Sequence, residues 1–359
     1  MLDASALSLP ALLGLFVVAA VAVWIAGISL SNTTDVLADR LHLGSALGGL
    51  ILLAVATNLP EIAITVSAAL QHHLDIAIGN LLGGVAVQTV VLVLLDVASR
   101  RRGAPLMARA ASLEPALEAG LVLAVLGVCI MGTQLPTTLV FHGFAPGATL
   151  VVLTWLIGVW LLGKARSGLP WQVRANGTPP PIPGEQAPGN QTSGNQTKEK
   201  PTSTGRAALV FTVAALVTLA GGLALEQTGE AIAGKIGLSG VLFGATVLAA
   251  ATSLPEISTG LAAMRLGNDE LAIGDIFGGN AFLPALFLPA ALLSGTAVLP
   301  RAGRSDVYLA ALGLLVTAVY LFGLIFRPRR RVLGMGVDSL VVLLLYLVGL
   351  LGLVAVARG

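Results

Sequence analysis

The sequence predicts an all-α membrane protein whose ten transmembrane helices form two inverted five-helix repeats. Three observations lead to this prediction. Hydrophobic residues make up 56% of the chain and charged residues only 11%, whereas a soluble domain carries about 25% charged residues. One acidic motif occurs twice at a fixed spacing, and Lys and Arg gather in alternate loops. A soluble enzyme is excluded, because a globular core cannot hide so many bilayer-length apolar runs.

Ten apolar runs are long enough to cross a hydrocarbon core about 30 Å thick. We assign five of them to a first repeat, residues 1–165, and five to a second repeat, residues 207–359. An odd number of crossings turns the second repeat over in the membrane, so the repeats are expected to be inverted. The runs cover residues 9–31, 43–70, 75–98, 113–133, 139–163, 207–228, 239–265, 270–294, 306–326 and 335–357.

Residues 166–206, between the repeats, are expected to form a disordered cytoplasmic linker. The stretch 171–206 holds almost no apolar side chain and cannot bury enough surface to fold. Basic loops stay in the cytoplasm, so we place the linker there, both termini outside, and the chain in the plasma (cell inner) membrane. Sixteen of the 20 Lys and Arg lie on the linker's side, and the other side holds only Lys235, Arg301, Arg304 and Arg358.

The repeated motif lies inside two of the predicted spans. Residues 56–62 (ATNLPEI) recur as 251–257 (ATSLPEI), and residues 77–84 (AIGNLLGG) recur as 272–279 (AIGDIFGG), both at an offset of 195 residues. A carboxylate inside such an apolar run costs about 2.5–3.5 kcal/mol on insertion scales, so it is a functional hypothesis by default. Proline-broken helices in both halves indicate a transporter site at the repeat interface.

The chemistry of the motif is that of a hard-cation site. Pro60 removes a backbone donor and should free carbonyls near Ala54 and Thr57, which a membrane tolerates only beside a cavity. With the Thr57 hydroxyl, the Asn58 amide and the Glu61 carboxylate, these carbonyls form the all-oxygen set that Ca²⁺ and Na⁺ prefer. In each copy the threonine lies four residues before the glutamate and shares its helical face.

The glycine-rich segments are expected to pack against the broken helices, because glycine allows close backbone approach. Taken singly, each motif has a simpler interpretation: a proline kink, a packing glycine, or a buried glutamate held in a structural ion pair. Gapless duplication of the whole set favours an ion site. One face of the first segment carries Asn80, Gly84 and Gln88, and its equivalent in the second carries Asp275, Gly279 and Leu283.

Residues 36–96 and 231–291 resemble the paired alpha repeats of the cation/calcium exchanger superfamily. The resemblance implies alternating-access antiport of Ca²⁺ against Na⁺ or H⁺, with the ions held by Glu61 and Glu256. It also implies hydroxyl and carbonyl ligands from Thr57, Thr252, Ser253, Ala54 and Ala249. With the other polar residues of the two segments, the candidate ion ligands are Glu61, Glu256, Thr57, Asn58, Thr252, Ser253, Ala54, Ala249, Gln88, Asp275 and Asn80.

The chain departs from the family pattern at the helices that carry the glycines. Gly84 and Gly279 stand where sodium/calcium members usually have serine, and Gln88 and Leu283 stand where Asn or Asp is common. Asp275 occupies a position that is often Asn, so it is a candidate for a displaced third carboxylate. With fewer oxygen ligands, we expect nearly electroneutral exchange that uses H⁺ or two Na⁺ rather than three Na⁺. Protons suit the site because desolvation disfavours the charged form of a buried carboxylate.

We therefore predict a secondary active cation antiporter that exports Ca²⁺ in exchange for Na⁺ or H⁺. Two alternatives remain at this point: a passive cation channel, and a non-transporting scaffold that has lost part of the ion site. An enzyme is not expected, since no His/Cys metal cluster or nucleophile–base pair is visible. The expected partners are the lipid bilayer and inorganic cations, without cofactor or nucleic acid, and no feature points to an oligomeric state.

The first testable prediction concerns topology. Single cysteines placed in residues 171–206 should react with an impermeant thiol reagent only from the cytoplasmic side, and tags at the two termini only from outside. The Cys129→Ser background provides the unlabelled control. Labelling of the linker in intact cells would contradict the layout and, with it, the inversion of the repeats.

Overall fold

A computed structural model describes residues 7–40, 53–140, 144–166, 204–237 and 249–358. These residues are almost entirely helical, and the described strands are one antiparallel pair, β1 (Arg331–Val332) with β2 (Met335–Gly336). The helices of the first half are α1 (Leu9–Arg40), α3 (Leu59–Leu70), α4 (Leu74–Ala98), α5 (Leu106–Arg109), α6 (Glu114–Thr133) and α7 (Pro146–Arg166). Those of the second half are α8 (Thr204–Ile236), α10 (Ala249–Thr252), α11 (Leu254–Arg265), α12 (Asp269–Phe282), η3 (Leu283–Leu286), α13 (Phe287–Ser294), η4 (Leu299–Arg301), α14 (Arg304–Phe326) and α15 (Val337–Arg358).

Eight of the described helical segments are long and apolar enough to cross a membrane, and they coincide with eight predicted spans. The all-α, multi-pass class is thereby confirmed. The predicted spans 43–70 and 239–265 are only partly described, since 41–52 and 238–248 lie outside the described residues, so the count of ten stays a prediction. The predicted linker also falls largely outside them, in 167–203, and the domain boundaries stay a prediction with it.

The predicted span 139–163 begins later in the structure than in the sequence analysis. α7 starts at Pro146, because proline has no backbone N–H and is best accommodated in the first turn of a helix. The other long helices start and end within a few residues of the predicted edges, except α1 and α8, which continue well past theirs.

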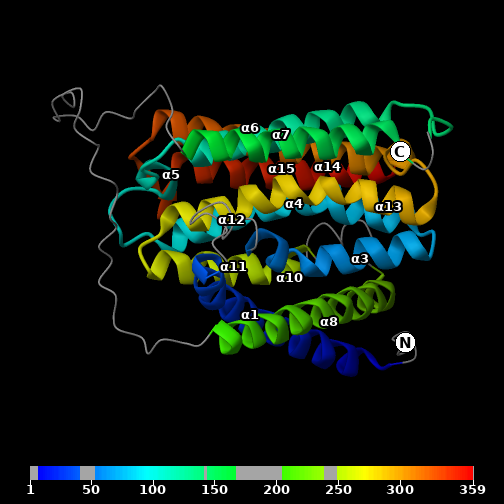
Figure 1. Cartoon of the computed structure of the whole chain (residues 1–359), viewed down its shortest axis with the longest axis horizontal. Helices are drawn as coiled ribbons and strands as arrows, with labels where there is room; N and C mark the ends of the chain where they lie inside the picture. Colours follow the sequence, from blue (N-terminus) through cyan, green and yellow to red (C-terminus); the bar gives the residue numbers. More distant parts are fainter. Residues whose placement is uncertain (1–6, 41–52, 141–143, 167–203, 238–248, 359) are drawn as a thin grey trace.

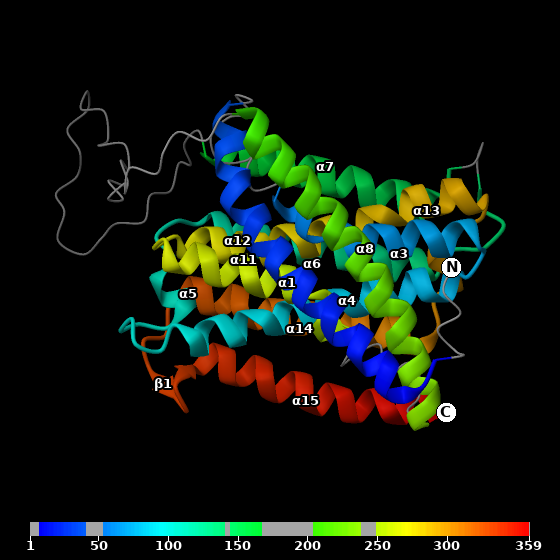
Figure 2. The same cartoon turned by 90° about the horizontal axis from the view of Figure 1, so that it is seen from below.

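The two halves are turned over relative to each other. The turn between α3 and α4 lies at one end of the bundle, whereas the equivalent turn between α11 and α12 lies at the opposite end (Figure 1). α1 begins and α15 ends at the first of these ends, and α7 ends and α8 begins at the other (Figures 1 and 2). The end from which the linker leaves also carries α5 and β1 and is called the basic end below.

Helix packing repeats between the halves. α1 packs on α8, α1 contacts α11 as α8 contacts α3, and α4 packs on α14 as α12 packs on α6. α6 also packs on α7 as α14 packs on α15. The centre is formed by α4 and by the span 269–294, in which 72% and 67% of the residues of the most apolar stretch are buried. In α1, α7, α8 and α15 only 22–28% of these residues are buried, so these helices face outward.

Two glycines let the outer pair α1 and α8 touch the broken helices. A Cβ atom built at Gly222 of α8 would lie 2.8 Å from Cα of Pro60, and one built at Gly27 of α1 would lie 3.0 Å from Cα of Pro255. Both glycines and both prolines are related by the same offset of 195 residues. Each half therefore presents a glycine to the proline of the other half, at a distance that admits no side chain.

A polar network fastens the basic end. Asp96 is 1% exposed and accepts hydrogen bonds from Leu106 N (2.9 Å), Gly336 N (2.6 Å) and Ser339 Oγ (2.8 Å). Arg331 Nη1 lies 3.7 Å from Asp96 Oδ1. Because this carboxylate is fully enclosed and accepts from both halves, it joins the end of α4 to the hairpin that precedes α15.

A second ionic contact also crosses between the halves at the basic end. Arg109 of α5 donates to Asp269 at the start of α12, with Nε 2.7 Å from Oδ2 and Nη2 3.2 Å from Oδ1. The two parallel bonds form the bidentate geometry that makes Arg–carboxylate pairs strong. α4, α5, α12 and the hairpin before α15 are thus linked by polar contacts at this end.

The second prediction tests the glycine contacts. Gly222→Ala should lower the free energy of unfolding by about 1–3 kcal/mol, because the added methyl must displace Pro60 in a closely packed region. The matched control is Gly234→Ala on the same helix, where a Cβ meets nothing within 4 Å and higher helix propensity should stabilise by up to about 1 kcal/mol. Thermal midpoints measured by size-exclusion chromatography in detergent compare the two. Equal midpoints would contradict the contact.

Candidate ion-binding site

The two motifs form short breaks rather than kinks within continuous helices. Residues 53–57 are helical, Asn58 is a turn, and α3 begins at Leu59 with Pro60 in its first turn. The second copy repeats this pattern, with Ser253 between α10 and α11. Each proline therefore starts a helix, where its missing N–H costs nothing. Each glutamate lies in the first turn, at the positive end of the helix dipole.

The backbone around Ala54 differs from the expectation. Its carbonyl was predicted to be free, but it accepts from Asn58 N (3.2 Å), from Asn58 Nδ2 (2.7 Å) and from Thr57 Oγ1 (3.3 Å). The Asn58 side chain folds back one turn and occupies the carbonyl that Pro60 was expected to expose. In this conformation Ala54 has no vacant carbonyl to offer an ion.

Three buried carboxylates line the interface where the broken helices meet α4 and α12. Glu61, Glu256 and Asp275 are 2%, 0% and 1% exposed. Glu256 lies close enough to Glu61 and to Asp275 for like-charge interaction with both. The two breaks also interact across the repeat interface, Glu61 with Thr252 and Glu256 with Thr57. The interface thus gathers negative charge that apolar helices surround.

Amides of α4 complete the side of the site around Glu61. Gln88 Nε2 donates to Asn58 Oδ1 (3.1 Å) and to Glu61 Oε1 (3.4 Å). Asn80 Nδ2 donates to the Glu61 backbone carbonyl (3.4 Å) rather than to its carboxylate. Gln88 therefore faces the ion site, whereas Asn80 positions the start of α3.

Hydroxyl groups complete the other side, around Asp275. Its Oδ1 accepts from Thr57 Oγ1 (3.4 Å), and its Oδ2 accepts from Thr259 Oγ1. Thr259 was not among the predicted residues. Its position three residues after Glu256 on α11 is the signal that could have identified it, since residues three apart share a helical face. The displaced carboxylate thus enters the same polar cluster as the motif threonine.

The remaining predicted residues are placed as follows. Thr252 and Ser253 are 5% and 2% exposed at the second break, and Ala249 begins α10. Leu283 brings a methyl group to 3.7 Å from the Cβ position of Gly84, so apolar packing fills this part of α4 and η3. A Cβ on Gly279 would lie 2.7 Å from Asn58 Nδ2, which explains why glycine is required at that point.

Acceptor oxygens without donors are the chemical signature of the site. Glu61 Oε2, Gln88 Oε1 and both carboxylate oxygens of Glu256 are buried and have no hydrogen-bond donor among the described residues. The Thr57 hydroxyl lies near Glu256, but it is directed to Ala54 and Asp275 and not in hydrogen-bond geometry with it. Buried acceptors in such numbers are unfavourable unless cations or protons compensate them.

The carboxylates are spread over the interface rather than gathered around one point. In the described part of the chain, no three His, Cys, Asp or Glu side chains are close enough to hold a single metal ion. A bound cation would therefore use one or two carboxylates and complete its shell with amide and hydroxyl oxygens, as hard cations accept.

Comparison with known proteins agrees with this geometry. A family model described as sodium/calcium exchanger protein matches residues 11–164 and 206–355. The chain belongs to this family. As a family member it is a transporter and not an enzyme.

Two relatives and one solved structure extend the family comparison. "Putative antiporter CaxA" of Alkalimonas amylolytica is 26% identical over 298 residues, 82% of this chain and 84% of the relative. "Inner membrane protein YrbG" of Escherichia coli (strain K12) is 26% identical over 250 residues, 67% of this chain and 69% of the relative. A structure of the sodium-calcium exchanger NCX_Mj superposes with a TM-score of 0.63 and 16% identity, over 96% of this chain and 99% of that one. At this identity the superposition establishes the shared fold.

The third prediction removes one carboxylate at a time. Glu256→Gln or Glu61→Gln should weaken Ca²⁺ binding about a hundredfold or more, because an uncompensated buried charge costs about 3–5 kcal/mol and 1.4 kcal/mol is tenfold in affinity. Binding of radioactive Ca²⁺ to the purified protein measures the effect. Glu270→Gln, at the basic end of α12, provides the control and should bind normally.

Asp275→Asn is the companion variant. If Asp275 contributes its charge to an ion, this change should also weaken Ca²⁺ binding at least tenfold, and Thr259→Val should produce a smaller loss. Unchanged binding in Asp275→Asn would demote the residue to a structural hydrogen-bond acceptor, while leaving the assignment of the two glutamates intact.

Proposed function

We propose that this exchanger moves Ca²⁺ out of the cell in exchange for H⁺ or Na⁺ by alternating access. The observation that carries the proposal is the set of buried acceptor oxygens on Glu61, Gln88 and Glu256 that lack donors among the described residues. An exchange site needs such oxygens, since they must be compensated by one ion before another can leave. The names of the relatives, an antiporter and a sodium-calcium exchanger, agree with it.

The protein would change between its two conformations only when the negative charge of the site is compensated by bound cations or protons. Two like-charged glutamates cannot remain ionised and empty in a low-dielectric interface without a cost of several kcal/mol per ion. A divalent cation, two monovalent cations or two protons each remove that cost. The empty, charged protein is thereby the unfavourable state, and release of one ion depends on arrival of the other.

The two halves would provide access to this site from the two sides of the membrane. Glu61 lies in the first turn of a helix that runs away from the basic end, and Glu256 in the first turn of one that runs toward it (Figure 1). An inverted pair of broken helices offers equivalent approaches to the same ions from opposite sides. We place the basic end in the cytoplasm because Lys and Arg gather there, and the name of the Escherichia coli relative, an inner membrane protein, supports the inner membrane of the cell as the location.

The ligand set favours exchange that moves little net charge. Leu283, Gly84 and Gly279 supply no side-chain oxygen. Few oxygen ligands are therefore available for a third Na⁺. Asp275 is already engaged with Thr57 and Thr259. One Ca²⁺ against two monovalent cations matches the two glutamate charges.

The fourth prediction follows from this charge balance. Ca²⁺ uptake into proteoliposomes under clamped voltage, with pH and Na⁺ gradients imposed separately, should depend weakly on membrane potential and rise with monovalent-ion concentration with a Hill coefficient near two. Protein-free liposomes provide the background. Strong acceleration by potential, with an absolute Na⁺ requirement and a Hill coefficient well above two, would contradict it. Ca²⁺ flux without any counter-ion would instead indicate a channel.

A further inference from the structure

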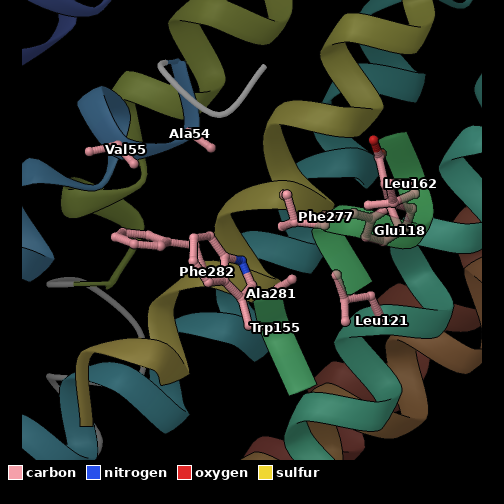
Figure 3. Close-up of a pocket in the computed structure, with 11 residues that line it drawn as sticks. Ala54, Val55, Glu118, Leu121, Trp155, Leu162, Phe277, Ala281 and Phe282 are labelled. Carbon is pink, nitrogen blue, oxygen red and sulfur yellow. The ribbon is translucent and has the colours of Figure 1, made fainter. Parts of the chain in front are cut away.

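A cavity of about 30 Å³ lies beside the ion site, between α6, α7, α12 and residues 53–57. That volume admits about two water molecules, since one water needs about 10–15 Å³. Figure 3 shows Glu118 and Leu162 at one end of the cavity and Trp155 with Phe282 toward the other. Leu162 follows Trp155 by seven positions on α7, which corresponds to about 10 Å along the helix. The cavity therefore extends from the basic end toward the middle of the bundle.

Glu118 is the charged residue among the described residues that line this cavity, and it is 3% exposed. The other lining side chains are apolar, with Leu121, Trp155, Phe277 and Phe282 the largest. A carboxylate in an apolar membrane cavity is costly, and such residues in membrane proteins mark ion or proton pathways. Glu118 is not among the eleven predicted site residues, and it makes no described contact with the candidate ion site.

The carboxylate at the cavity has an apolar counterpart in the other half. Repeated contacts relate α6 and α7 to α14 and α15 by 191 residues, since a Cβ on Gly158 would meet Leu121 as one on Gly349 would meet Leu312. This offset pairs Glu118 with Leu309, whose methyl group lies 3.4 Å from the Cβ position of Gly83 on α4. In the first half Glu118 stands at the equivalent position and lines the cavity with Gly278, the counterpart of Gly83. The carboxylate is therefore an addition to one side of a repeated scaffold.

The inner wall of the cavity is thin where it meets the ion site. Ala54 and Gly278 line the cavity, and the neighbouring Gly279 touches Asn58, which lies in the site. Residues 53–57 and the α12 backbone at Gly278 and Gly279 thus form a wall common to the cavity and the candidate site.

Glu118 is the titratable side chain among the described residues that line the cavity. The residues that α7, α12 and 53–57 contribute to the lining carry no ionisable side chain. On its own helix, Glu114 lies one turn closer to the basic end. Lys164 follows Leu162 by two residues on α7, and Asp275 precedes Gly278 by less than one turn on α12.

We propose that Glu118 is a proton acceptor and donor that connects the basic side to the exchange site. The inference rests on the proposed function and specifies its counter-ion. A hydrated metal ion does not fit a space for about two waters beside one carboxylate, whereas a proton needs only a short water chain. Glu118 takes a proton from water at the basic end, and water in the cavity carries it to the glutamates as Ca²⁺ departs, with the reverse transfer when Ca²⁺ binds.

The test compares Glu118→Gln with the wild type in proteoliposomes that contain a pH-sensitive dye. Ca²⁺ exchange driven by a pH gradient, and the accompanying proton movement, should fall at least tenfold. Exchange driven by Na⁺, and the affinity for Ca²⁺ at high pH, should stay within twofold. Glu118→Asp should retain most proton-driven exchange, because it keeps a carboxylate, and Glu114→Gln should behave as the wild type.

A second variant tests the cavity without removing the charge. Ala281→Leu fills the space beside Glu118 and should slow proton-driven exchange selectively. The inference is overturned if Glu118→Gln keeps the wild-type proton-driven rate, if its proton-driven and Na⁺-driven rates fall equally, or if the wild type exchanges only against Na⁺. None of these results affects the proposed function, which fails separately if no gradient drives Ca²⁺ exchange or if Glu256→Gln binds Ca²⁺ normally.

Discussion

The desolvation of carboxylates at the repeat interface is the constraint on which the rest of this protein depends. Glu61, Glu256 and Asp275 are held where water does not reach, and the described residues supply fewer donors than these groups can accept from. Such an arrangement is a poor way to stabilise a fold, because the penalty for burying a charge exceeds what a neutral neighbour returns. It is useful only to a protein that receives cations. The broken helices, the glycines that bring α1 and α8 close, and the ties at the basic end all hold this unfavourable centre together.

Much of this centre could be predicted from the sequence because duplication carries information that single motifs lack. The offset of 195 residues singled out both glutamates, and helical spacing placed Gln88 on the face that the structure turns toward Glu61. The Ala54 carbonyl was mispredicted because the Asn58 side chain competes for it, and such local bonding depends on rotamers. Thr259 and Glu118 were missed for a different reason: neither is repeated, so a search for repeats cannot detect them. Most of the predicted linker could not be compared, since it lies outside the described residues.

The backbone arrangement of the two halves is therefore more symmetric than the polar side chains that it carries. Packing pairs, proline breaks and glycine contacts recur between the halves, as do the motif threonines and glutamates, whereas the polar groups around them differ. Amides gather around Glu61 and hydroxyls around Asp275, and a fourth carboxylate, Glu118, stands where its counterpart is Leu309. The two halves thus share one backbone arrangement while contributing different side chains to the candidate ion site.

The network around Asp96 has a consequence for how the chain is made. Its carboxylate accepts from Gly336 and Ser339, 240 and 243 residues further along the chain, so these donors emerge from the ribosome long after α4 has entered the bilayer. Until then the first half carries a charge near the membrane surface that its own sequence satisfies only in part, through Leu106. The hairpin and the start of α15 thus complete the first half, and a chain truncated before them should be recognised by quality-control proteases as unfinished.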